Sequence, residues 1–373
     1  MADYKLFSAD SHVSEPPDLW VERIGREFRD RAPRVESRLQ DGREQDVFVY
    51  EGFPPHRVAV GLAAAALRGD RNEFRERRGN YKDARPGGWD PAERLKDQEL
   101  DGVDGEVLYT TLGFRLFWLE DAALQRACFR VYNDWLAEYC SHSPERLVGL
   151  GLVSLYDVAQ GVEELRRCAK LGLKGAMIWC SPPDDHPYTL EEYDPFWAEA
   201  QDLGLPISLH SLTGNHESRT PLNWYLHLVV MHYEVERSLA TLIMSGVLER
   251  FPRLRFVSAE NNGGWVPHFV ERVDKAVGTG RFTFPTRLTM TPGEYFRRQV
   301  FVTYIDDPIA IANRHLIGID NLMWSSDYPH NQSTWPRSQD IVARDFKDAD
   351  PAERRKIVRD NVLSVYNPVQ VPV

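Results

Sequence analysis

The chain has 373 residues, of which 42% are hydrophobic and 27% charged, and its 45 basic against 56 acidic side chains give a net charge of −11. This acidic balance, without an extended basic run, argues against nucleic acid and anionic membranes as partners. No stretch approaches the roughly 18 apolar residues of a membrane-spanning helix, and the N-terminus lacks a signal-peptide core. The four cysteines show no CxxC spacing. We therefore expect a cytoplasmic protein with reduced thiols.

Eight short apolar runs predict eight β-strands, and amphipathic segments with helical periodicity separate most of them. The strands are expected at residues 5–10, 105–111, 147–154, 175–180, 205–210, 255–260, 300–305 and 322–327. The helices are expected at residues 121–141, 158–171, 190–203, 222–251, 266–277 and 308–316, with two closing helices between residues 339 and 366. This alternation is typical of a parallel (β/α)8 barrel, the TIM-barrel fold. An open doubly wound sheet is the rival, but no glycine-rich phosphate turn follows the first strand.

Two stretches are too long for simple connections between a strand and a helix. Residues 13–90 follow the first predicted strand, and residues 278–298 precede the seventh. Long segments at the C-terminal ends of strands commonly cover or shape an active site. We therefore expect one domain, residues 1–373, in which the insertion at residues 13–90 acts as a lid and residues 339–373 form a helical tail.

Polar side chains stand at the ends of four of these strands. Asp10 and His12 close the first strand, His210 the fifth, Glu260 the sixth and Asp327 the eighth. Residues i and i+2 of a strand point to the same face, so Asp10 and His12 lie on one side. In a parallel barrel all strands end at one rim, where the catalytic groups lie. The pattern predicts that these side chains meet and are able to bind a metal.

Several longer motifs resemble the amidohydrolase superfamily, in particular its amidohydrolase-related branch with aminocarboxymuconate semialdehyde decarboxylase and γ-resorcylate decarboxylase. They are the Asp-x-His opening, ISLH at 207–210, SGVLERFPRLRFVSAE at 245–260 and WSSDYPH at 324–330. The segments QELDGVDGEVLYTT at 98–111 and RVYNDWLAEYCSHSPERLVGLGLVSL at 130–155 also look typical of this branch. The resemblance extends over nearly the whole chain.

The resemblance implies one divalent metal, held by Asp10, His12, His210 and Asp327. Two imidazoles and two carboxylates suit Zn²⁺ best, with Mn²⁺ as the alternative because half of the donors are hard oxygens. Binuclear relatives use a carboxylated lysine at the end of the fourth strand. Here that strand ends in MIWC, and Lys174 lies at its opposite end. The sequence therefore predicts a mononuclear site.

The chain departs from the family pattern at two positions. Asp10 replaces the first histidine of the common His-x-His opening, so it binds the metal either directly or through water. Glu260 stands where the family's decarboxylases carry a proton-handling histidine, and it is either a general acid or base or a further ligand. His330, three residues after Asp327, is a second candidate for the proton role, with loop ordering as the alternative. The catalytic candidates are therefore Glu260, His330 and Asp327.

The branch favours non-oxidative decarboxylation of a small aromatic or unsaturated carboxylic acid. A hydrolase that uses a metal-activated water on an amide, ester or C–C bond is the alternative. A barrel without catalysis, serving as a scaffold, is the third reading.

Substrate contacts and assembly are predicted from fewer residues. Arg57, in the insertion, is a candidate partner for a substrate carboxylate. Trp265 and Trp335 are candidates for the aromatic wall of a substrate pocket. The apolar-rich segment at residues 221–251 favours a homodimer or larger homo-oligomer.

Overall fold

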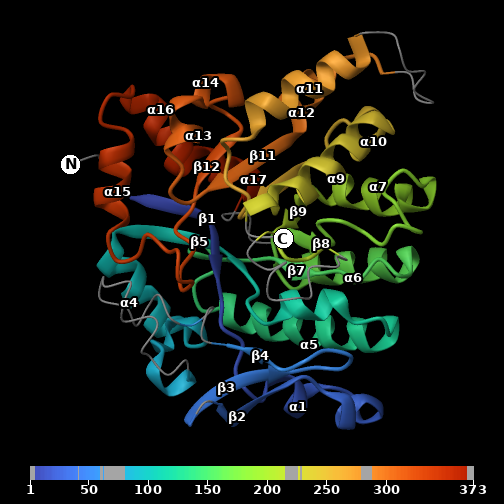
Figure 1. Cartoon of the computed structure of the whole chain (residues 1–373), viewed down its shortest axis with the longest axis vertical. Helices are drawn as coiled ribbons and strands as arrows, with labels where there is room; N and C mark the ends of the chain where they lie inside the picture. Colours follow the sequence, from blue (N-terminus) through green and yellow to red (C-terminus); the bar gives the residue numbers. More distant parts are fainter. Residues whose placement is uncertain are drawn as a thin grey trace.

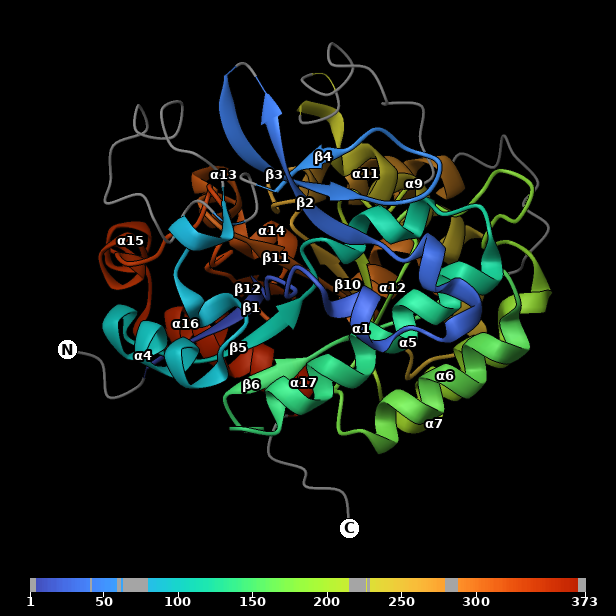
Figure 2. The ribbon, with the colours of Figure 1, turned by 90° about the horizontal axis from the view of Figure 1, so that it is seen from below.

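The computed structural model describes residues 5–40, 42–58, 80–214, 229–278 and 288–367, together with residues 62 and 226. Within them the central strands form two parallel sheets surrounded by helices (Figures 1 and 2). The first sheet has the order β1–β5–β6, with bounds Leu6–His12, Val103–Tyr109 and Leu147–Gly149. The second runs from β7 through β8, β9, β10 and β11 to β12. Their bounds are Gly151–Leu152, Ala176–Ile178, Ile207–His210, Phe256–Ala259, Val300–Tyr304 and Leu322–Trp324.

Every predicted strand is present, and the one at 147–154 changes partner along its length. The amide of Leu150 donates to the carbonyl of Leu108 on β5, whereas the amide of Gly151 donates to the carbonyl of Gly175 before β8. At the other end, the amide of Asp327 donates to the carbonyl of Asp10, at 2.9 Å. Each strand therefore lies beside the next in chain order. All residues of β1 are buried, as expected for parallel strands covered on both faces.

Helices follow the strands and lie on the outside of the sheets (Figure 1). Those of the first half are α4 Pro91–Asp101, α5 Ala122–Cys140, α6 Val158–Lys170 and α7 Asp194–Leu203. Those of the second half are α9 His232–Met244, α10 Val247–Arg250, α11 Val266–Gly278, α12 Pro292–Gln299, α13 Pro308–Ala312 and α14 Arg314–Ile317. Aspartate side chains cap the first turns of α4, α5 and α6, because each accepts hydrogen bonds from free amides there.

The predicted helix at 222–251 is wrong as a single element. It is divided into α9 and α10 by Gly246, which has a φ of 78°. Glycine adopts this left-handed backbone conformation at little energetic cost because it has no Cβ atom. Residues 222–225 and 227–228 of that prediction lie outside the described residues. The tail contains the two predicted closing helices. The first is α15 Ser338–Asp345, and the second runs without a break from α16 Pro351–Arg355 through the π-helical segment Lys356–Asp360 into α17 Asn361–Tyr366.

The insertion at residues 13–90 contains structure of its own. Helix α1, Leu19–Arg23, precedes an antiparallel sheet of β2 Arg34–Gln40, β3 Arg43–Val49 and β4 His56–Arg57. Figure 2 shows this small sheet projecting from the body of the molecule. Residues 59–61 and 63–79, and residues 279–287 of the second long segment, lie outside the described residues.

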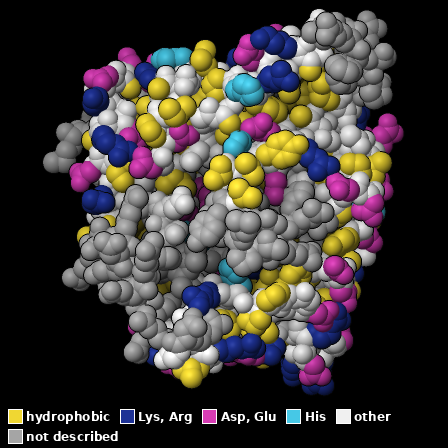
Figure 3. Space-filling model, in the orientation of Figure 1, with side chains coloured by type: hydrophobic (Ala, Val, Ile, Leu, Met, Phe, Trp, Pro, Cys, Tyr) yellow, Lys and Arg dark blue, Asp and Glu magenta, His cyan; other side chains and the backbone are white. Residues whose placement is uncertain are grey.

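The surface and the helices agree with the composition. On the face drawn in Figure 3, acidic and basic side chains are interspersed. None of the described helices combines the length and apolar composition needed to cross a membrane. All four cysteines are buried and none forms a disulfide, as predicted.

Candidate metal centre

The five residues predicted to converge do so, in a buried group that we call the metal cluster: Asp10, His12, His210, Glu260 and Asp327. Two of them lie on β1, one ends β9, one follows β10 and one follows β12. Four of their side chains are buried, whereas that of Glu260 is 21% exposed. The cluster is therefore reached from outside on the side of Glu260.

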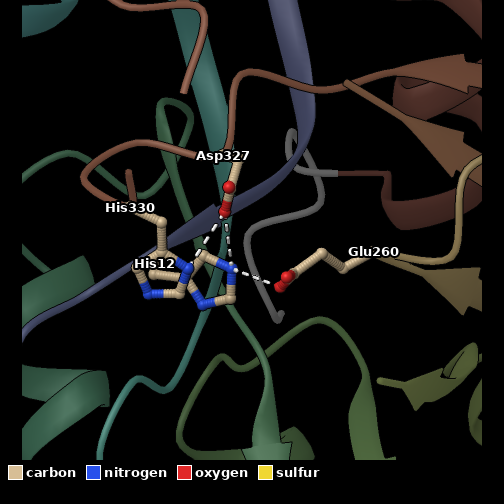
Figure 4. Close-up of side chains that lie close together, drawn as sticks. All are labelled: His12, Glu260, Asp327 and His330. Carbon is tan, nitrogen blue, oxygen red and sulfur yellow. Dashed lines mark ion pairs between the residues drawn. The ribbon is translucent and has the colours of Figure 1, made fainter. Parts of the chain in front are cut away.

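Five side-chain atoms of the metal cluster face one another at short range. The Nε2 atom of His12 lies 3.4 Å from Oδ1 of Asp10, 3.6 Å from Oε2 of Glu260 and 3.3 Å from Oδ1 of Asp327. The Nε2 atom of His210 lies 3.5 Å from Oδ1 of Asp10 and 3.4 Å from Oε2 of Glu260. Figure 4 shows dashed lines from one ring nitrogen of His12 to the carboxylates of Glu260 and Asp327.

None of these five atoms has a hydrogen-bond partner among the described residues. Buried polar atoms are normally paired, because an unpaired one costs free energy. Two ligands that lie about 2.1 Å from one ion are themselves about 3 to 3.5 Å apart, which fits the spacing found here. The residues present therefore fit a single divalent cation as the common partner of the five atoms.

The hydrogen bonds of His12 and His210 use Nδ1 of each ring and leave Nε2 directed toward the metal cluster. Nδ1 of His12 lies 2.8 Å from the carbonyl of Thr110, and Nδ1 of His210 lies 2.9 Å from the carbonyl of Ser211. A carbonyl only accepts, so each Nδ1 carries a hydrogen, and each Nε2 is the nitrogen that remains for a metal once it is free of a proton. Such partners fix the tautomer and the ring orientation of metal-binding histidines.

Two members of the metal cluster have unusual backbone conformations. Glu260 has a φ of 53° and Asp327 a φ of 55°, in the left-handed region that non-glycine residues rarely adopt. Thr303 on β11 helps to hold Glu260, because its Oγ1 accepts from the Glu260 amide at 3.0 Å and donates to Oδ2 of Asp10 at 3.2 Å. Strain of this kind is concentrated at functional sites.

The pKa values within the metal cluster reflect burial and close charges. Burial, with His330 nearby, lowers the pKa of His12 to about 4. Burial and the neighbouring Asp327 raise the pKa of Glu260 to about 8. Burial opposes the charged form of His210, but Asp10 and Glu260 outweigh it and raise its pKa to about 9. Without a cation the cluster therefore retains protons, which a metal would displace on binding.

His330 adjoins the metal cluster. Its ring stacks on that of His12, with centroids 3.8 Å apart, and its Nδ1 lies 3.1 Å from Oδ1 of Asp327. Its Nε2 lies 3.0 Å from Oγ1 of Thr111, whose own hydrogen goes to the carbonyl of Val13 at 2.6 Å. The hydroxyl therefore accepts from Nε2–H of His330. Although burial opposes the charged form, Asp327 raises the pKa of His330, so this imidazole is well placed to hold a proton.

A sequence profile of the amidohydrolase family matches residues 9–367. The chain belongs to this family. Among curated relatives, 2-amino-3-carboxymuconate-6-semialdehyde decarboxylase of Dictyostelium discoideum is 28% identical over 65% of this chain and 67% of its own. Gamma-resorcylate decarboxylase of Rhodococcus jostii is 29% identical over 63% of this chain and 74% of its own.

Solved structures of amidohydrolases have the same fold. An amidohydrolase from Mycobacterium avium subsp. paratuberculosis superimposes with a TM-score of 0.80 at 22% identity, covering 98% of this chain and 100% of its own. A dihydroxybenzoic acid decarboxylase from Polaromonas, solved with bound manganese and the inhibitor 2-nitroresorcinol, has a TM-score of 0.67 at 17% identity. That superposition covers 98% of each chain. These neighbours imply a TIM-barrel architecture.

Three other positions named from the sequence are not members of the metal cluster. Lys174 precedes β8, at the end of the strand opposite to the cluster. Arg57 lies on β4 with an exposed side chain. The indole Nε1 of Trp265 donates to the carbonyls of Asn261 and Asn262, so this ring braces the loop after Glu260. Roles of Arg57 and Trp265 toward a substrate stay predictions.

Three residues near the metal cluster were not identified from the sequence. Thr303 and Thr111 orient members of the site through hydroxyls, and threonine is too common for its type to signal this role. The ring of Phe114 lies 4.5 Å from that of His210 and 5.5 Å from that of His12, between centroids. Its signal was its position, five residues after the end of β5 in the 3₁₀ turn Gly113–Trp118.

Proposed function

We propose that this amidohydrolase is a metal-dependent decarboxylase of a small aromatic carboxylic acid. The observation that carries the proposal is the convergence of buried ligand atoms in two groups that share His12. One group is Asp10, His12 and His210, and the other is His12, Glu260, Asp327 and His330. The curated relatives named above are decarboxylases of an unsaturated or an aromatic acid, and they support the reaction class. The intact set of donors argues against the third reading, a scaffold without catalysis.

We further propose that the eight strands close into one (β/α)8 barrel within a single domain, residues 1–373. Support comes from the order of the strands and from the hydrogen bonds that join β1 to the segment after β12. In this arrangement residues 13–90 act as the lid and residues 339–373 as the helical tail. The C-terminal ends of the strands would then surround the metal cluster.

Asp10, His12, His210 and Asp327 would hold the metal, with Glu260 beside it. With Glu260 beside the two ligand carboxylates, the site is richer in hard oxygen atoms than the choice of Zn²⁺ from the sequence assumed, so Mn²⁺ is the better candidate. The manganese in the Polaromonas neighbour supports this choice. When bound, the ion supplies positive charge that polarises a substrate oxygen and stabilises charge developing on it.

The reaction needs a proton at the ring carbon that bears the carboxylate. The ring–carboxylate bond then breaks, its electron pair returns to the ring, and CO₂ leaves. Glu260 and His330 are the exposed acids of the site, with side chains 21% and 12% exposed. We propose that Glu260 donates this proton, with His330 as the alternative donor. Asp327 orients His330, and Arg57 and Trp265 are proposed to contact the substrate.

A panel of substrates tests the reaction. Mn²⁺-loaded protein is incubated with 2,6-dihydroxybenzoate, other hydroxylated aromatic acids, and their amides and esters, while CO₂ release and product mass are followed together. We expect CO₂ from at least one acid and no turnover of the amides or esters. Gain of water by an amide or ester without CO₂ would support the hydrolase alternative. That alternative is favoured by Glu260, which stands where the family's decarboxylases carry a histidine.

Replacing Asp10 with asparagine tests how this acid contributes. Its Oδ1 faces both histidines of the metal cluster, and its Oδ2 accepts from Thr303. Loss of a direct ligand charge is expected to remove the Mn²⁺, whereas loss of an outer partner is expected to lower activity about 10- to 100-fold with the metal retained. Metal content and CO₂ release are measured together. Retained metal with reduced turnover would place Asp10 outside the direct ligands, and no change in either would remove it from the site.

We also propose a homodimer or larger assembly. Leu226, Val229, Val230 and Tyr233 are 58%, 72%, 52% and 63% exposed, before and at the start of α9, and their sequence spacing of i, i+3, i+4 and i+7 is typical of one helical face. Light scattering at micromolar concentration is expected to give at least twice the mass of one chain. Val229→Glu should reduce that mass, with Glu271→Gln on the exposed face of α11 as the control. A wild-type monomer would contradict the proposal.

A further inference from the structure

A buried arginine contacts both of the chain segments that carry the metal cluster's first and last ligands. Arg94 lies on α4 and is fully buried. Its Nη1 donates a 2.7 Å hydrogen bond to the main-chain carbonyl of His12. Its guanidinium carbon lies 4.3 Å from the ring centroid of Tyr328, the residue after Asp327. One side chain therefore touches the backbone of one ligand and the neighbour of another.

The charge of Arg94 is balanced inside the protein. Its Nε donates to Oε2 of Glu106 on β5 at 2.6 Å, and Gln98 donates to the same oxygen at 2.7 Å. A buried pair of this kind is costly to break from one side, because the remaining charge is left without compensation. The planar guanidinium serves a carboxylate, a carbonyl and an aromatic face at once, which a lysine ammonium cannot do.

The same helix holds Tyr328 at a second point. The Tyr328 hydroxyl donates to Oδ2 of Asp97 at 2.5 Å, and Asp97 lies three residues after Arg94. The amide of His12 in turn donates to the carbonyl of Tyr328 at 2.6 Å. Helix α4 therefore fixes the end of β1 and the loop after β12 in one arrangement, from outside the metal cluster.

We propose that Arg94 is a positioning residue of the metal centre. It holds His12 and the Asp327–Tyr328 segment at the separation that lets their ligand atoms reach one ion. The inference rests on the proposed function only in that the metal cluster binds a divalent cation. Arg94 itself touches neither the metal nor the substrate, and its effect is on how well the ligands are prearranged.

Arg94→Lys is the direct test, with Mn²⁺ affinity measured by competition against a chelator. We expect affinity to fall about 10- to 100-fold, because outer partners of metal ligands contribute at that level. Arg314→Lys is the matched control. Its Nε also donates to a glutamate, Glu353 at 2.8 Å, and its Nη1 to a carbonyl, that of Ile311 at 3.1 Å. It should alter thermal stability without altering Mn²⁺ affinity.

A folded Arg94→Lys protein that binds Mn²⁺ as tightly as the wild type would overturn the inference. An equal loss of affinity in Arg314→Lys would also overturn it, because the effect would then be one of general stability. If Arg94→Lys does not fold, Glu106→Gln decides, since it keeps the volume and removes the charge that holds Arg94. A fall in affinity supports the inference and unchanged affinity refutes it. Failure of the wild type to bind Mn²⁺ would instead refute the proposed function.

Discussion

Replacing His210 with alanine is expected to remove the metal and abolish turnover while the protein stays folded. Its Nε2 faces Oδ1 of Asp10 and Oε2 of Glu260, so the variant loses the nitrogen ligand on that side of the metal cluster. The fold should persist, because the core of the molecule consists of apolar strand residues such as Ile207 and Leu209 on the same strand. Metal content, CO₂ release and circular dichroism are measured on one preparation.

His315→Ala is the control for this substitution. His315 is an exposed histidine of α14 that lies 3.6 Å from a carboxylate oxygen of Glu353, so its loss should leave metal and turnover unchanged. Full activity of His210→Ala would exclude the proposed ligand set. Loss of the fold would show that the His210 imidazole stabilises the core as well as binding the metal.

Glu260→Gln is expected to lower turnover by about 10²- to 10⁴-fold without loss of the metal. The substitution keeps the shape of the side chain and removes the group proposed to handle the proton. Burial raises the pKa of Glu260, which favours a carboxyl able to hold a proton, whereas a bound cation favours the ionised form. Turnover and metal content are compared with those of Glu271→Gln, an exposed acid on α11.

Each result for Glu260→Gln assigns this residue a different role. Reduced turnover with full metal content supports the proton role. Joint loss of metal and turnover would make Glu260 a metal ligand, which its 3.4 Å approach to His210 also allows. Unchanged turnover would move the proton role to His330, and His330→Asn should then be the damaging substitution.

The positions of the residues in the metal cluster were predictable from the sequence because parallel strands end at one edge. Asp10, His12, His210 and Glu260 were each found by locating the end of an apolar run, and Asp327 by the polar residues that follow one. The periodicity of the strands gives these ends to within a few residues, and the side chains then follow from residue type. The eight strands were found for the same reason.

The contacts that orient the metal cluster were not predictable in this way. Thr303 bridges Glu260 and Asp10, but its hydroxyl resembles that of any other threonine in the sequence. Arg94 lies in a polar amphipathic helix, where an arginine is usually solvent-exposed, yet it is fully buried against Glu106. The left-handed backbone of Glu260 and Asp327 is set by tertiary hydrogen bonds and leaves no sign in residue type.

The break between α9 and α10 shows a different limit. The apolar pattern of residues 222–251 continues across Gly246, because both helices pack on the same core. Periodicity follows the buried face and does not register a turn within it. The glycine itself was the available signal.

The number of divalent ions bound per chain tests the central claim most directly. Purified protein is loaded with Mn²⁺, freed of excess metal by gel filtration without chelator, and analysed by elemental mass spectrometry against protein concentration. The close approach of the ligand atoms of the metal cluster predicts one ion per chain, lost in His210→Ala. Less than about a tenth of an equivalent in the wild type would contradict the account, because the cluster would then be compensated by its protons alone.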